Sequence, residues 1–260
     1  MNIVFLTTED THHYYLINEI HKFHSVKKVF YQTKHIKHKD LGKRFRRVID
    51  PRRLRFTIRS LLVKLLFNKE IVLRRKYENK MFFNNAVPYL NPEIPTEKIF
   101  SFNIPEEVEK VRKEKPDLII VFGTEVLKGE ILEVASLDIL NIHRNILPKY
   151  RGGGLPSWIF YNKDFDNLGT TIHLCAEKLD AGDIVSQKFY SLKRDDRIYT
   201  LRYKTTLIAL EILKETIEKY KDGSIEYNKQ EPSKLWTSKN MTIFKEIIAR
   251  RNFNNYIKNL

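Results

Sequence analysis

The run 117-DLIIVFG-123 decides the fold, because it is almost wholly apolar and ends at a glycine. An apolar run of this length is typical of a central strand in a parallel sheet that helices cover on both faces. A second strand of this kind begins at Asp138 and ends in 141-NIH-143. The N-terminus reads as strand, helix and strand over 2–6, 12–23 and 26–31, which is the order of a βαβ unit. We therefore predict an α/β fold with an open, mostly parallel, Rossmann-like sheet and helices on both faces.

The remaining pattern divides the chain into a large domain over 1–222 and a small strand-and-helix extension over 223–260. The large domain includes a basic helical segment over 34–83. The turn after the first strand has no G-x-G-x-x-G motif, which disfavours a dinucleotide site. Periodicity predicts further strands at 98–102, 169–175 and 184–190, and helices at 54–75, 105–115, 125–135 and 198–220.

Composition limits the classes of protein that this chain can represent. With 260 residues and 42% hydrophobic content, it can form one large α/β domain with at most a small appendage. Its single cysteine, Cys175, excludes an intramolecular disulfide and a multi-thiolate zinc site, and no other metal site is expected. There is no signal-peptide pattern and no apolar run of about 20 residues. These features together predict a cytoplasmic protein.

The positive charge is concentrated in one segment. Residues 34–80 hold 17 Lys or Arg and four acids, so they contribute +13 of the net charge of +15. Such a segment predicts contact with an anionic ligand, a nucleic acid or a membrane surface, although a simply solvated basic helix has the same pattern. Within it, a helical apolar row either packs inward or lies on a membrane; its members are Leu54, Ile58, Leu61, Leu62, Leu65 and Leu66.

Asn141 and His143 are polar residues at the end of a strand that should be apolar. Residues two apart on a strand point to the same side, so the two side chains should lie together, with Ile142 opposite. They stand at the carboxyl end of the strand, where open parallel sheets bind ligands. An unpaired buried polar group costs about 1–3 kcal/mol, so the pair needs partners. The pair either serves a ligand or satisfies the loop that follows.

A tight turn, 178-KLDAGD-183, follows some forty residues later between two predicted strands. Gly182 would permit unusual backbone angles in this turn. A carboxylate at Asp180 could fix the tautomer of a nearby imidazole and favour its charged form. The alternative is that Asp180 only caps the turn, which is common for aspartate.

Four motifs in this order resemble the formyltransferase fold family. They are 141-NIH-143, 147-LPKYRG-152, 169-GTTIH-173 and 179-LDAGD-183, and the resemblance covers about 117–190. The family includes glycinamide ribonucleotide formyltransferase, methionyl-tRNA formyltransferase and the nucleotide-sugar N-formyltransferases. The resemblance implies an enzyme that moves the formyl group of N10-formyltetrahydrofolate, a co-substrate, onto a primary amine.

The resemblance also implies roles for single residues. Asn141 matches an asparagine whose amide binds the formyl oxygen, and His143 matches a histidine that stabilises the oxyanion or takes the amine proton. Asp180 matches an aspartate that supports the imidazole and relays a proton through water to the folate nitrogen. The folate would be bound by the segments that contain Gly123, Thr124, Val126, Leu127 and Asp180. His173 matches a histidine of the purine branch, and we expect it to be a core residue.

The preferred acceptor is a nucleotide-linked amino sugar, a precursor of lipopolysaccharide glycans. The tail, with Gln230, 234–239 and 241–242, resembles the tails of sugar N-formyltransferases. A diphosphate needs cations and a nucleobase needs an aromatic surface. The cationic candidates are Lys149, Arg151, Arg74 and Arg75, and the aromatic candidates are Trp158, Tyr150 and Tyr77. A homodimer is compatible with this interpretation.

Three other functions stay open. The first is formylation of methionyl-tRNA, in which the basic segment would bind the nucleic acid. The second is a hydrolase on the same fold that releases formate without an acceptor. The third is a non-catalytic basic module that binds nucleic acid or an anionic membrane, which would leave Asn141, His143 and Asp180 unexplained.

Overall fold

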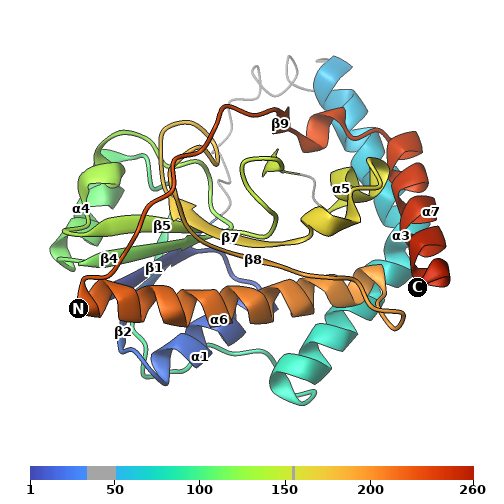
Figure 1. Ribbon diagram of the computed structural model, residues 1–260. Helices are drawn as coiled ribbons and strands as arrows, with labels where there is room; N and C mark the ends of the chain where they lie inside the picture. The colour runs from blue at the N-terminus through green and yellow to red at the C-terminus, as the bar shows by residue number, and fades with distance from the viewer. Residues whose placement is uncertain (34–50, 154–155) are drawn as a thin grey trace, which may run out of the picture.

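The computed structural model describes residues 1–33, 51–153 and 156–260. Its main sheet has seven strands in the order β3-β2-β1-β4-β5-β7-β8 (Figure 1). The first five pair in parallel, whereas β7 is antiparallel to both β5 and β8. The predicted mostly parallel sheet is therefore confirmed. The strands are β1 (Ile3–Thr7), β2 (Val26–Gln32), β3 (Thr96–Ile99), β4 (Leu118–Phe122), β5 (Asp138–His143), β7 (Gly169–Leu174) and β8 (Ile184–Phe189).

Strand β4 is the middle strand of the seven-stranded sheet, and every one of its side chains is buried. Leu118, Ile120 and Phe122 enter the core on one face of the sheet. Ile119 and Val121 enter the core on the other face. This alternation in a continuous apolar run is what a strand covered on both faces requires.

Helices cover both faces of the sheet, as predicted. One face packs against α1 (Thr11–His21) and α6 (Leu201–Asp222), which run beneath the sheet in Figure 1. The other face packs against α4 (Pro105–Lys113) and the short 3-10 helix η1 (Gly129–Glu133). Helix α4 begins with Pro105 in its first turn, where the missing N–H has no intrahelical partner to lose.

A third core joins the C-terminal residues to the middle of the chain. Helix α5 (Ser157–Tyr161) packs against α7 (Ile243–Asn259), and the short strands β6 (Arg151–Gly152) and β9 (Leu235–Trp236) pair in parallel. Three short 3-10 helices complete this region, namely η2 (Phe165–Asn167), η3 (Ile198–Thr200) and η4 (Ser238–Asn240). The buried side chains of this core include Trp158, Phe160, Met241 and Phe253.

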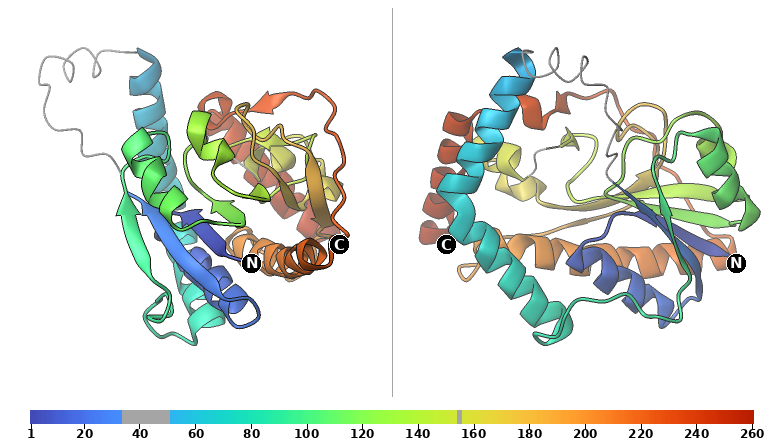
Figure 2. Two further views of the ribbon diagram at one scale, coloured as in Figure 1. Left: turned by 90° about the vertical axis from the view of Figure 1, so that its left-hand side faces the viewer. Right: turned by 180° about the vertical axis from the view of Figure 1, so that it is seen from behind.

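Helix α3 (Pro51–Phe83) is longer than the predicted 54–75, and its backbone departs from helical geometry at Phe67. It lies beside α7 (Figures 1 and 2), where the Arg250 guanidinium pairs with Glu70 at 2.9 Å and covers the Phe67 ring. Its apolar row is not packed inward, because Ile58, Leu61, Leu62, Leu65 and Leu66 are exposed. The part of the basic segment over 34–50 lies outside the described residues. Among the helices described, none combines the length and hydropathy needed to cross a membrane.

Two predicted elements differ in the structure. The helix expected over 125–135 is only η1, because the Glu125 carboxylate is held by the Ser101 hydroxyl and the Phe102 N–H, and Gly129 has a φ of +67°. The strand expected over 98–102 is β3, which begins two residues earlier. It ends before Ser101 because that residue turns towards Glu125.

The role predicted for Gly182 is also corrected. Gly182 does not have a left-handed φ. It is constrained by space, because a Cβ at this position would lie 2.0 Å from the carbonyl oxygen of Leu174. The left-handed residue of the turn is Asp180, with a φ of +48°. Aspartate is among the few side chains that tolerate this region. Gly182 is thus required for close packing against β7, and Asp180 provides the unusual angle.

We expect Gly182→Ala to lower the free energy of unfolding by about 1–3 kcal/mol, because the new methyl group meets backbone that cannot move aside. Gly153→Ala is the matched control, since a Cβ there meets nothing within 4 Å. It should change stability by less than about 0.5 kcal/mol. Urea denaturation of both variants measures the difference. Equal stability of the two variants would contradict the close contact with Leu174.

Candidate active site

A cavity of about 820 Å3 opens at the carboxyl ends of β1, β4 and β5. This is the edge at which open α/β sheets bind ligands. The loops after β1 and β4, the end of β5 and the turn at Leu179 and Asp180 line one side. Residues of α3, α6 and α7 line the other side. The cavity therefore joins the sheet edge to the helices that the C-terminal part of the chain packs beside it.

His143 and Asp180 face each other in this cavity. The distance from His143 Nδ1 to Asp180 Oδ2 is 3.5 Å, and both side chains are less than a tenth exposed. The other ring nitrogen, Nε2, lies 2.8 Å from the carbonyl oxygen of Tyr150. A carbonyl only accepts hydrogen bonds, so Nε2 carries a proton and donates it. Donation from Nδ1 to Asp180 then requires a second ring proton, that is, a cationic imidazole.

The Asp180 carboxylate also binds the backbone of the short strand β6. Gly152 donates its backbone N–H to Asp180 Oδ2 at 2.8 Å. Gly152 has a φ of +100°, and a Cβ there would lie 2.1 Å from the carbonyl oxygen of Trp236. Only glycine fits at this position. One buried carboxylate therefore fixes the turn, the following loop and the imidazole together.

Asn141 has a defined partner in His173. The Asn141 amide nitrogen lies 2.9 Å from His173 Nε2, and His173 Nδ1 lies 2.8 Å from the carbonyl oxygen of Leu174. His173 must therefore carry its proton on Nδ1 and accept from Asn141 at Nε2. Burial, with the nearby charge of His143, lowers the pKa of His173 to about 4. The neutral ring leaves the second amide proton of Asn141 for another acceptor.

His173 was expected to be a core residue, and it is 2% exposed. It also lines the cavity and lies 3.7 Å from Asp180 Oδ1. The structure thus places Asn141, His143, His173 and Asp180 on one wall. The position of His173 opposite Asn141 comes from the antiparallel pairing of β5 with β7, which the sequence spacing did not reveal.

The residues expected to bind folate also line the cavity. Gly123, Thr124, Val126 and Leu127 follow β4 at its carboxyl end. Gly123 has a φ of +76°, and a Cβ there would lie 2.9 Å from His13 Cε1, so the chain passes close to this ring. Leu127 is 3% exposed and also belongs to the core between α4 and η1.

The aromatic residues expected to stack on a nucleobase do not line the cavity. Tyr150 is buried, and its hydroxyl donates to Asp164. Trp158 is buried in the third core and donates to the carbonyl oxygen of Thr237. Tyr77 packs against Tyr199 and Tyr203. Of these aromatic groups, Tyr199 reaches the cavity.

Of the four cations expected to bind a diphosphate, one lines the cavity and three do not. Lys149 is exposed and pairs with Asp164 at 2.7 Å, and Arg151 donates to the carbonyl oxygen of Leu179 at 2.7 Å. Neither lines the cavity, and the exposed Arg75 does not line it either. Arg74 does line it, and its Nε is buried without a hydrogen-bond partner.

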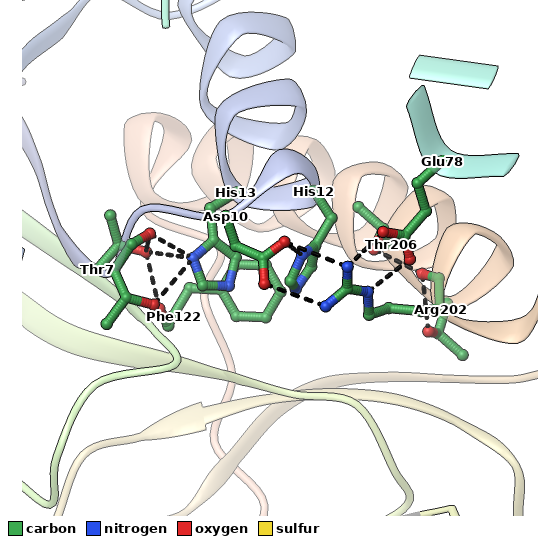
Figure 3. Close-up of polar contacts among 10 residues, drawn as sticks. Thr7, Asp10, His12, His13, Glu78, Phe122, Arg202 and Thr206 are labelled. Atoms are coloured by element: carbon green, nitrogen blue, oxygen red, sulfur yellow. Dashed lines mark hydrogen bonds and ion pairs between the residues drawn. The ribbon is translucent and has the colours of Figure 1, made fainter. Parts of the chain in front are cut away.

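A second polar cluster follows β1 and was missed by the sequence reasoning (Figure 3). Arg202 of α6 donates to two carboxylates, those of Asp10, which precedes α1, and of Glu78, which lies on α3. His13 Nδ1 lies 2.7 Å from the carbonyl oxygen of Thr8, and burial lowers the pKa of His13 to about 4. Burial also lowers the pKa of His12 well below its usual range. The polar run 7-TTEDTHH-13 at the end of a strand was the signal, as it was for β5.

The single thiol in the cavity is unreactive. Burial raises the pKa of Cys175 to about 12, so the thiol stays protonated near neutral pH and is a poor nucleophile. Within the described parts of the chain, no group of three His, Cys, Asp or Glu side chains is placed to hold a metal ion.

Comparisons with known proteins show which family and which folds this chain is similar to. The formyl transferase family model matches residues 96–217. Methionyl-tRNA formyltransferase of Limosilactobacillus fermentum is 33% identical over 178 residues, which is 68% of this chain and 54% of that protein. The fold is similar to that of a sugar N-formyltransferase from Shewanella, with a TM-score of 0.59, 14% identity, and coverage of 97% of this chain and 87% of the other.

A third similar protein is WlaRD, a sugar 3N-formyl transferase whose structure was determined with dTDP and 5-N-formyl-THF. It has a TM-score of 0.57 and 15% identity, and the match covers 98% of this chain and 81% of the other. The chain therefore carries a formyl transferase domain over the matched residues 96–217, and its fold is similar to that of the sugar N-formyltransferases. It spans about half the length of the curated methionyl-tRNA formyltransferases that it matches.

The buried histidines predict a pH dependence of stability. His13 and His173 have folded-state pKa values of about 4, below the value of about 6.5 for an unfolded chain. Between these values the unfolded chain binds more protons, so stability is full above pH 6.5 and falls as the pH drops towards 4. Each ring contributes a slope of up to about 1.4 kcal/mol per pH unit.

We expect His13→Asn to reduce the slope of unfolding free energy against pH between 6.5 and 4 by up to about 1.4 kcal/mol per pH unit. The asparagine cannot be protonated, and its amide can still donate to the Thr8 carbonyl oxygen. Chemical denaturation across this pH range measures the slope. The same slope in the variant and the parent would show that His13 is not held neutral.

Proposed function

We propose that the chain is an N-formyltransferase that moves the formyl group of N10-formyltetrahydrofolate to the primary amine of a nucleotide-linked amino sugar. The observation that carries the proposal is the wall formed by Asn141, His143 and Asp180, with His143 and Asp180 3.5 Å apart at the carboxyl edge of the sheet. The formyl transferase domain supports the reaction type. Fold alone does not set the substrate, so the acceptor is argued separately.

The size of the cavity supports the binding of a folate. Its volume of about 820 Å3 falls in the range of small-molecule sites. The left-handed Gly123 and the chain up to Leu127 expose backbone at its edge, where a flat ring with donors and acceptors could bind. In this proposal Gly123, Thr124, Val126, Leu127 and Asp180 hold the folate. The folate supplies an activated formyl group, and the protein supplies the orientation and the charges.

The proposed transfer forms a bond between the amine nitrogen and the formyl carbon and breaks the bond from that carbon to folate N10. The free amide proton of Asn141 and the cationic His143 stabilise the negative charge that develops on the formyl oxygen. The amine loses a proton and folate N10 gains one. Asp180 lies beside His143 Nδ1 and can help move this proton at the edge of the cavity.

The amino-sugar acceptor is supported by the solved structures. The likeness to the sugar N-formyltransferase from Shewanella extends over nearly the whole of both chains. The WlaRD structure, similar over 98% of this chain, was determined with dTDP. The aromatic groups first expected to stack on the base lie outside the cavity, whereas Tyr199, Tyr190, Phe122 and Phe160 line it and are the aromatic candidates.

Methionyl-tRNA is the second candidate acceptor, because curated relatives similar in sequence are methionyl-tRNA formyltransferases. The basic segment over 34–80 would then contact the nucleic acid. Activity on methionyl-tRNA should in that case fall steeply with salt concentration, since phosphate contacts release counterions. Activity on an amino-sugar nucleotide should depend much less on salt.

Asn141→Ala should lower kcat for formyl transfer by about 10²–10³, because one donor to the developing oxyanion is removed. The test is a panel of amino-sugar nucleotides with N10-formyltetrahydrofolate, in which release of tetrahydrofolate and the formyl mass increment are followed. Asn162→Ala is a matched control, since Asn162 directly follows α5 and its amide donates to the Tyr150 hydroxyl outside the cavity. Equal rates for Asn141→Ala and the parent would remove Asn141 from the chemistry. Formate release without an acceptor would indicate a hydrolase.

His173 acts in this scheme as a positioning residue. His173→Phe removes the acceptor that orients the Asn141 amide, so kcat should fall while KM for the folate stays within about threefold. His173→Gln places a carbonyl oxygen near the same point and should restore part of kcat. A parallel fall in kcat and thermal stability, without rescue by glutamine, would show a merely structural role.

A further inference from the structure

Arg144 is a cation in the cavity without a counter-ion. It directly follows His143 at the end of β5, and its side chain lines the cavity. Its guanidinium lies 5.9 Å from the centre of the Phe122 ring. Among the described residues, no hydrogen bond or ion pair reaches it. The adjacent imidazole has two partners, whereas this side chain has none.

The acids near Arg144 are already engaged. Asp10 and Glu78 both bind Arg202, which bridges them from α6 (Figure 3). Burial, followed by the repulsion from Arg202, lowers the pKa of Arg144 to about 10, and Arg74 also contributes to this repulsion. Even so, the Arg144 guanidinium stays charged near neutral pH. In this group the guanidiniums of Arg202, Arg144 and Arg74 outnumber the carboxylates of Asp10 and Glu78 by one.

Arg74 is the second cation of this kind. It reaches the cavity from α3, and within the described residues it forms no ion pair, while its Nε is buried without a hydrogen-bond partner. Arg202 lies on α6 and Arg144 directly follows β5, so with Arg74 of α3 three parts of the chain contribute arginines to the cavity. Both arginines are half-buried, and Glu78 and Asp10, which attract them, are already paired with Arg202, so an anion bound in the cavity would be stabilised by both guanidinium groups.

We infer that Arg144 and Arg74 bind a phosphoryl group of the acceptor, and that this contact selects acceptors that carry a phosphate or diphosphate near the amine. Arginine suits this role, since its planar guanidinium can donate two parallel hydrogen bonds to phosphate oxygens. The statement that the acceptor carries an amine rests on the proposed function. The statement that the cavity binds an anion does not depend on it. It adds Arg144 to the candidate cations and excludes Lys149, Arg151 and Arg75, which do not line the cavity.

The location constrains the acceptor. The Cα atoms of consecutive residues are about 3.8 Å apart, so Arg144 begins next to the histidine that faces the reacting amine. Because Arg144 and His143 line the same cavity, we expect the phosphoryl group and the amine to belong to one acceptor molecule. A sugar ring that carries the amine on one carbon and a diphosphate on another meets this requirement. An uncharged amino sugar lacks the anion and should be a poor acceptor.

The test uses the full chain and inorganic pyrophosphate as the probe, titrated by calorimetry at fixed ionic strength. We expect pyrophosphate to bind the parent protein and its Kd to rise at least tenfold in Arg144→Gln and in Arg74→Gln. Arg75→Gln is the matched control, because it removes one charge from the same helix outside the cavity. Malonate, a dicarboxylate, should bind at least tenfold more weakly than pyrophosphate. Unchanged Kd in the two cavity variants, no binding to the parent, or equal binding of malonate would overturn the inference.

Thermal denaturation separates this role from a structural one. In the absence of anions, Arg144→Gln removes an unpaired charge, so its Tm should equal or exceed that of the parent. Pyrophosphate should raise Tm of the parent but not of the variant. A clear fall in Tm of the ligand-free variant would mean that Arg144 supports the fold, and it would contradict the inference.

Kinetics distinguish the failure of this inference from the failure of the proposed function. If formyl transfer to an amino-sugar nucleotide is found, Arg144→Gln should raise KM for that acceptor at least tenfold and leave the Kd for 5-formyltetrahydrofolate unchanged. An unchanged KM would overturn the phosphoryl contact while the transferase function stands. If no acceptor is found, the pyrophosphate titration still tests the anion site by itself.

Discussion

The buried carboxylate of Asp180 is the contact on which the candidate site depends. It accepts the Gly152 N–H at 2.8 Å and faces His143 at 3.5 Å and His173 at 3.7 Å. The two histidines lie on the neighbouring strands β5 and β7, and Asp180 connects them to the separate segment that contains Gly152. Asp180 adopts a left-handed backbone conformation to reach them. Such conformations cost about 1–3 kcal/mol and persist where the surrounding structure fixes them, often at functional sites.

The cavity combines neutral and charged groups in separate places. Near the sheet edge, His173 is held neutral by burial, which makes it an acceptor for the Asn141 amide. Towards the helices, the ion pairs of Arg202 use the available acids and leave Arg144 without a partner. The first arrangement orients a neutral donor beside His143. The second leaves Arg144 and Arg74 without an ion pair among the described residues of the same cavity, where the proposal places the anion.

The fold and part of the site could be predicted from local patterns. The apolar run at 118–122 required a central strand, and the placement of Asn141 and His143 followed from the alternation along β5. Contacts between distant segments could not be predicted in this way. The pairing of β5 with β7 places His173 beside Asn141, and α7 fills the space around Trp158. Tyr150 and Trp158 looked like stacking surfaces in the sequence, but aromatic side chains are equally suited to a core.

The most direct test of this arrangement is 15N NMR of the histidine rings in the full protein. The contact from His143 to the Tyr150 carbonyl oxygen requires a proton on Nε2, which leaves Nδ1 to face Asp180. The expected result is therefore a protonated Nε2 on His143, together with a protonated Nδ1 and an unprotonated Nε2 on His173. An unprotonated Nε2 on His143 would contradict the account, because the ring could then not contact Tyr150 and Asp180 in the way described.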